Sequence, residues 1–97
     1  MPNRAQALAR AEAFVDDGRF EADLAGRVAV PSESQVPERF AELGRYQTDL
    51  MAPAFEALGF EHVLLENPVP GRGPVLVASR IEDPSLPTVL LYGHGDV

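Results

Sequence analysis

The first part of the chain has apolar residues at the three- and four-residue spacing of a helix. This spacing predicts a first helix over residues 3–16, with Asn3 as its N-cap and Gly18 as its end. A second, shorter helix is expected over residues 20–27, where one side carries the apolar side chains. The opening third of the protein is therefore predicted to be helical.

A longer apolar stripe follows a loop that is rich in proline and serine. The loop is expected over residues 30–35, and Pro37 suits the first turn of the helix after it. Pro53 falls inside the stripe, and proline lacks the amide hydrogen that an inner helical turn uses. The pattern therefore predicts a kinked helix, or two helical segments, ending at Gly59.

After Gly59 the pattern becomes strand-like. Strands are expected over three ranges, 60–66, 75–81 and 88–92. Within the last range, residues 89–92 are apolar on both faces, which is typical of a central strand with layers on both sides. The order of elements predicts an α/β fold, with N-terminal helices followed by three strands of a mixed sheet, and residues 1–97 show no internal domain boundary.

Composition narrows the classes of function. The chain has 97 residues, a formal net charge of -7 and no cysteine. This charge disfavours nucleic acid and anionic membranes as partners, and disulfides and thiolate metal sites are excluded. The N-terminus is not an apolar leader and no membrane-spanning run is present, so we expect a cytoplasmic protein. All eight basic residues are arginine, which fits a GC-rich bacterial genome.

The candidate chemistry lies in the last residues, where an apolar strand is followed by Gly93, His94, Gly95 and Asp96. Sites in α/β sheets form beyond the carboxyl ends of strands. Residues two apart in an extended chain point the same way, so the Asp96 carboxylate can orient the His94 imidazole for a metal ion. From these residues alone two interpretations stay open: a metal ligand with its orienting carboxylate, or a solvated His–Asp pair in a turn.

Other polar motifs are weaker. His62 is expected to be a surface or packing residue. The glycines at 71 and 73 lack the setting of a phosphate-binding loop. The Ser32-Glu33-Ser34 segment has no neighbouring histidine in sequence to activate a hydroxyl, so we expect a loop or a cap there.

The sequence resembles the N-terminal part of a zinc metallopeptidase family that includes acetylornithine deacetylase, succinyl-diaminopimelate desuccinylase, aminoacylase and glutamate carboxypeptidase. Three blocks carry the resemblance, in order: Val28–Ser34, Phe55–Phe60 and Leu90–Val97. The last block is similar to the first metal-site motif of the family. The resemblance implies that His94 binds one of two zinc ions and that Asp96 orients it; cobalt or manganese would also suit such ligands.

For a complete family member, the resemblance implies hydrolysis of an amide bond by a metal-activated water, with a dipeptide or an N-acyl amino acid as substrate. The other metal ligands and the glutamate base of the family lie downstream of this motif. We therefore expect an incomplete portion of a larger catalytic domain that is inactive alone.

Two alternatives are also open. The first is a small non-enzymatic module that pairs through an exposed sheet edge, with self-association through its uncovered strands. The second is an autonomous metal-binding protein that uses His94, Asp96 and carboxylates from a second copy.

Overall fold

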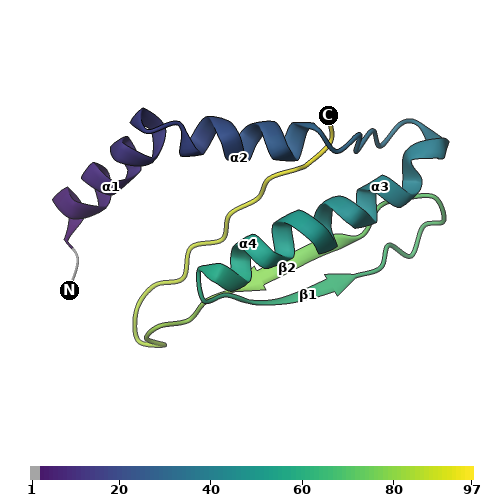
Figure 1. Ribbon diagram of the computed structural model, residues 1–97. Coiled ribbons are helices and arrows are strands. Elements are labelled where there is room, and N and C mark those ends of the chain that lie inside the picture. Colours follow the sequence, from purple (N-terminus) through teal and green to yellow (C-terminus); the bar gives the residue numbers. More distant parts are fainter. Residues whose placement is uncertain (1–2) are drawn as a thin grey trace.

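Helices form the first part of the molecule and a strand hairpin follows them (Figure 1). The computed structural model describes residues 3–97. Helix α1 (Arg4–Asp16) begins at Asn3, whose side chain and that of Gln6 accept hydrogen bonds from each other's backbone amides. Gly18, at φ 85°, makes the bend into helix α2 (Arg19–Val28). Both predicted helices are confirmed because their signals are local: a capping pair and a glycine that tolerates positive φ.

The longer helical stretch is continuous, but its middle is widened. It begins with a 3₁₀ turn (Pro37–Arg39) and continues as α3 (Phe40–Arg45), a π-helical stretch (Tyr46–Met51) and α4 (Ala52–Ala57). The amide of Ala52 bonds to the carbonyl of Gln47, five residues back. The expected disturbance near Pro53 therefore takes the form of a π-helical stretch immediately before it.

Strands β1 (Glu61–Leu65) and β2 (Val75–Ser79) form a two-stranded antiparallel sheet. Its register pairs His62 with Ala78 and Leu64 with Leu76. The ring of His62 lies 2.6 Å from a carboxylate oxygen of Glu56 on α4, so this face of the hairpin is turned toward the helix. The opposite face carries Val63, Leu65, Val75 and Val77, which are each about half exposed.

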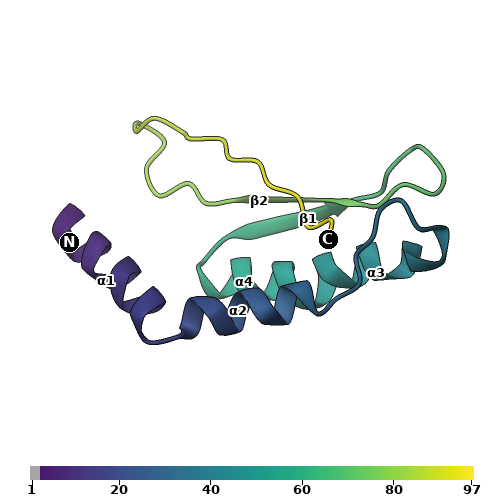
Figure 2. The ribbon, with the colours of Figure 1, turned by 90° about the horizontal axis from the view of Figure 1, so that it is seen from above.

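The third predicted strand is wrong. Residues 88–92, all within the described part of the chain, form no strand, and the sheet is a hairpin rather than a three-stranded mixed sheet. Residues 82–97 leave β2, turn, and run back toward the end of α2, as Figure 2 shows. A strand exists only where a neighbouring chain accepts and donates its backbone hydrogen bonds, and no described segment does this for residues 88–92.

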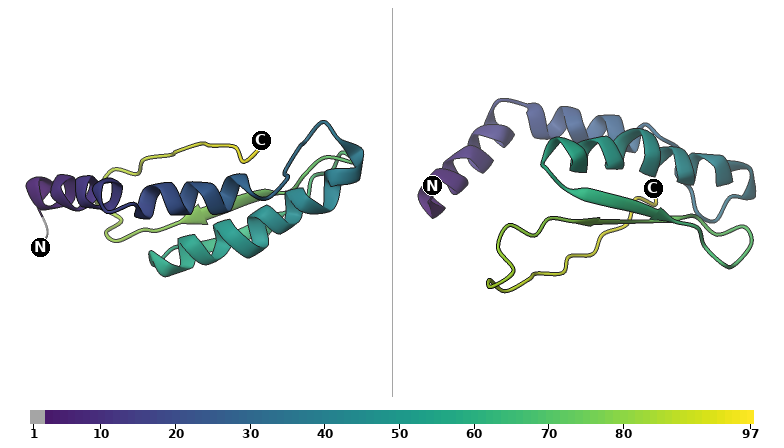
Figure 3. Two further views of the ribbon diagram at one scale, coloured as in Figure 1. Left: turned by 45° about the horizontal axis from the view of Figure 1, so that its top comes forward. Right: turned by 90° about the horizontal axis from the view of Figure 1, so that it is seen from below.

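The helices α3 and α4 cover one side of the hairpin, and α1 extends away from it (Figure 3). Among the described residues the buried apolar side chains are Val30 and Ala52, at 5% and 7% exposure. The accessible surface is 7947 Å², whereas a folded monomer of 10.5 kDa exposes about 5,400 Å². The radius of gyration is 15.8 Å, against about 12.5 Å for a closed domain of this length. The molecule is therefore open, with α/β character but without a closed core.

Within residues 3–97 no helix combines the length and the apolar character that crossing a lipid bilayer requires.

Candidate metal-binding loop

Two segments that are about sixty residues apart in sequence meet near the end of α2. We call residues 31–34 the serine loop and residues 93–97 the His94 loop. The C-terminal end of the chain lies beside the end of α2 in Figure 1. Three hydrogen bonds join the two loops, so the first and last blocks of the family resemblance are neighbours in space.

Ser32 lies at the centre of this junction. Its hydroxyl donates a hydrogen bond of 2.5 Å to the carbonyl oxygen of Gly95. Its own carbonyl accepts one of 3.3 Å from the amide of Val97. Ser32 is 1% exposed, the most buried of the described polar residues. A hydroxyl this deeply buried requires a partner, and the Gly95 carbonyl provides it.

The serine loop is shaped locally before it meets the His94 loop. The amide of Ser32 bonds to the carbonyl of Val30 at 2.8 Å, and the amide of Glu33 bonds to that of Pro31 at 2.9 Å. These two successive tight turns direct the Ser32 side chain inward, next to buried Val30. The local turns thus place the Ser32 hydroxyl where it can donate a hydrogen bond to the distant Gly95 carbonyl.

Asp96 is held by the serine loop. Its carboxylate accepts a hydrogen bond of 2.7 Å from the amide of Ser34. This backbone bond, with a smaller contribution from the Ser34 hydroxyl and from the charge of His94, lowers the pKa of Asp96 below its ordinary value. The carboxylate is therefore ionised and fixed at neutral pH. Its partner here is Ser34, and the orientation of His94 by Asp96 stays a prediction.

His94 is exposed at the outer side of the junction. The residues on both sides of it are glycines, and Gly95 is packed against the ring of Tyr46 on the π-helical stretch. A side chain at position 95 would overlap this ring, so the glycine is required by close approach rather than by its backbone angles. The loop is thus anchored through Gly95 and Asp96, while the imidazole remains accessible.

The described residues do not bring together the ligands that a metal site requires. In residues 3–97 there is no group of three or more histidine, cysteine, aspartate or glutamate side chains placed to hold one ion. A catalytic zinc site has three protein ligands and a water. His94 with one nearby carboxylate falls short of this set, and no reaction step can be derived from it alone.

His62, the other histidine, has a different role. Its ring contacts Glu56 and is partly covered, and it lies on the face of β1 that is turned toward α4. This contact joins the hairpin to the helix, as expected of a packing residue. It gives a natural control for experiments on His94.

Sequence reasoning missed the role of Ser32. The sequence predicts a loop or a cap at residues 32–34 without a partner for the hydroxyl, because a hydroxyl that bonds a carbonyl 63 residues away has no local signal. The one available sign was indirect: the serine loop and the His94 loop are both blocks of the same resemblance.

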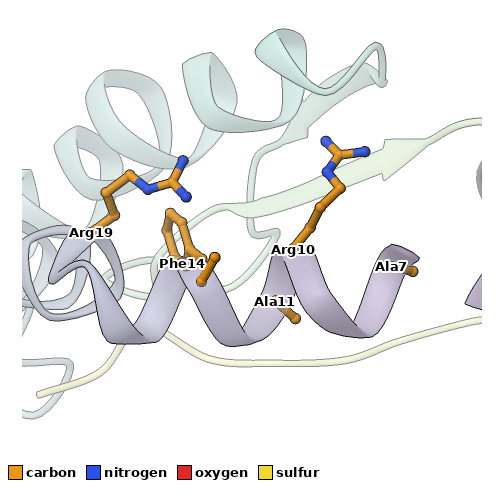
Figure 4. Close-up of a pocket in the computed structure, with 6 residues that line it drawn as sticks. Ala7, Arg10, Ala11, Phe14 and Arg19 are labelled. Atoms are coloured by element: carbon orange, nitrogen blue, oxygen red, sulfur yellow. The ribbon is translucent and has the colours of Figure 1, made fainter. Parts of the chain in front are cut away.

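A separate hollow lies at the bend between α1 and α2. It is lined by Ala7, Arg10, Ala11, Ala13, Phe14 and Arg19. Figure 4 shows the guanidinium groups of Arg10 and Arg19 on the same side as the Phe14 ring, and Arg19 lies 5.0 Å from the centre of that ring. The hollow shares no residue with the His94 loop, and its surface is open.

Comparison of the chain with known protein families, with curated protein sequences and with solved structures gives no match.

Proposed function

We propose that this chain forms the opening part of the catalytic domain of a metal-dependent amide-bond hydrolase, in which His94 is a zinc ligand. The observation that carries the proposal is the junction of the serine loop with the His94 loop. Three hydrogen bonds and a buried serine hold the glycine-flanked histidine at a defined place. A solvated turn has no need of such an anchor.

The open surface supports the same proposal. The chain exposes about 2,500 Å² more than a closed monomer of its mass. The outer face of the hairpin and residues 89–92 are apolar and uncovered. Covering layers of a larger domain would bury this surface and would bring the remaining metal ligands to His94. The substrate class that goes with the proposal is a dipeptide or an N-acyl amino acid.

Zinc titration followed by NMR tests the role of His94. We expect the ring signals of His94 to shift as Zn²⁺ is added to the wild-type chain, and this response to vanish in His94→Ala. The matched control is His62→Ala, which removes the other imidazole and should leave the response of His94 intact. An equal response of both histidines would show adventitious binding and would contradict the proposal.

The chain is expected to be inactive alone, because its described residues form no group of three metal ligands, and the carboxylate of Asp96 is already bound by the Ser34 amide. Assays with dipeptides and N-acyl amino acids in the presence of Zn²⁺ should show no turnover above buffer. Zinc-dependent hydrolysis that disappears in His94→Ala would overturn this expectation.

A second candidate function is self-association through residues 88–92. Leu90 and Leu91 are 95% and 85% exposed, and the backbone around them has no strand partner in the described structure. An extended apolar segment with free backbone groups is suited to pairing with another chain. This candidate predicts an oligomer whose apparent mass rises with concentration.

A further inference from the structure

We infer that Ser32 is a positioning residue: its buried hydroxyl fixes the His94 loop against α2 and the π-helical stretch, and thereby sets the place of the His94 imidazole. The inference rests on the proposed function for its chemical meaning, and on hydrogen bonds and burial for its geometry. Ser32 would thus position the His94 loop and would take no part in covalent chemistry.

The contacts around Ser32 are reciprocal. Its hydroxyl donates to the Gly95 carbonyl at 2.5 Å, and its carbonyl accepts from the Val97 amide at 3.3 Å. Ser32 thus bonds to the backbone groups of the two residues that flank Asp96. The amide of Ser34 binds the Asp96 carboxylate itself. Gly95 directly follows His94, so a fixed Gly95 carbonyl limits where the imidazole can lie.

The burial of Ser32 indicates that this bond matters to the loop. Among the described residues of the chain, which is open elsewhere, Ser32 is the most buried, at 1% exposure. The packing of Gly95 against Tyr46 closes the other side of the loop. Loss of the hydroxyl would leave the part-buried Gly95 carbonyl without this donor, which favours release of the loop into solvent.

The test uses Ser32→Ala, with Ser85→Ala as the matched control. Ser85 also donates a hydroxyl hydrogen bond, to Asp83, but it lies in the turn after β2 and away from the junction. The first readout is structural: nuclear Overhauser effects between the Tyr46 ring and Gly95, and hydrogen exchange of the Ser34 and Val97 amides. We expect Ser32→Ala to lose these effects and to exchange both amides at least tenfold faster, with the β1–β2 signals unchanged.

The second readout is zinc affinity at His94, measured by NMR titration of the wild type and both variants. Residues that orient a metal ligand change metal affinity by about 10- to 100-fold. We expect about tenfold weaker binding in Ser32→Ala and unchanged binding in Ser85→Ala. If the wild type shows no zinc response, the proposed function fails, while the first readout still decides whether Ser32 positions the loop.

The inference is overturned if Ser32→Ala keeps the Tyr46–Gly95 effects and normal exchange at residues 34 and 97. It is also overturned if the loop is released but zinc affinity at His94 stays unchanged. Should the alanine variant lose the β1–β2 signals, Ser32→Cys takes its place. Cysteine keeps a similar volume with a weaker donor, so it should give the same changes at smaller amplitude.

Discussion

The ring of Tyr46 lies against Gly95 so closely that no side chain fits between them. Tyr46 is the first residue of the π-helical stretch, and Gly95 directly follows His94. The widened helix therefore supplies one wall of the place where the His94 loop lies. Together with the bond from Ser32, this contact fixes the loop on two sides.

Gly95→Ala should displace the His94 loop. The added methyl group overlaps the Tyr46 ring, and overpacking of this kind costs about 1–3 kcal/mol. The change should appear as altered amide shifts across residues 93–97, with the β1–β2 signals unchanged. Combining Gly95→Ala with Tyr46→Ala removes the overlapping ring and should restore part of the loop's order. If the double variant is no better than the single one, the ring is not the obstacle.

Leu90→Glu with Leu91→Glu should reduce self-association. Both side chains are exposed in an extended segment without a strand partner, so charges there oppose pairing between copies. Gel filtration over increasing concentration should show the wild type growing in apparent mass and the double variant staying a monomer. The control is Leu86→Glu, which adds a charge at an exposed leucine outside the segment. A monomeric wild type at all concentrations would remove the pairing function from consideration.

The hydrogen bonds between Asp17 and Arg19, at the start of helix α2, should be lost at low pH. The Arg19 side chain, at 2.8 Å, and then the Arg19 amide, at 3.1 Å, lower the pKa of Asp17 from its ordinary value of 3.8. A lowered native pKa stabilises the folded state above about pH 3.8, and this contribution is lost as pH falls through the native value. NMR titration should show the Arg19 amide losing its Asp17-bonded shift below pH 3.8. Asp17→Ala should lack that transition, and the same transition in the variant would argue against Asp17 as its source.

The elements with local signals could be predicted from the sequence. Asn3 with Gln6, and Gly18 and Gly59 at positive φ, mark helix ends through bonds and angles within a few residues. The strand over residues 88–92 could not be judged in this way, because apolar character favours a strand only where a partner backbone is present. The sequence pattern shows that residues 88–92 are suited to a strand, but it does not show whether another segment pairs with them.

The same distinction between local and long-range signals holds for the candidate site. His94 and Asp96 could be singled out from their spacing after an apolar segment. The bond from Ser32 to Gly95 and the packing of Tyr46 on Gly95 join residues about fifty to sixty positions apart. Only the folded chain brings these partners together. The contacts that anchor the His94 loop therefore could not be predicted from the sequence.

The π-helical hydrogen bonding of residues 46–51 should require the proline at position 53. In a regular α-helix the ring of Pro53 would crowd the carbonyl of Asp49 and leave it without a donor, and the wider turn from Gln47 to Ala52 avoids this conflict. Pro53→Ala should convert residues 46–51 to α-helix and raise the free energy of unfolding by about 1–2 kcal/mol in urea titrations. The control is Pro37→Ala, in the first 3₁₀ turn, where a missing amide costs little. Because the conversion turns Tyr46 relative to α4, the Tyr46–Gly95 contact should weaken as the helix gains stability. A variant that keeps its π-helical carbon shifts at residues 46–51 would show that Pro53 is not the cause.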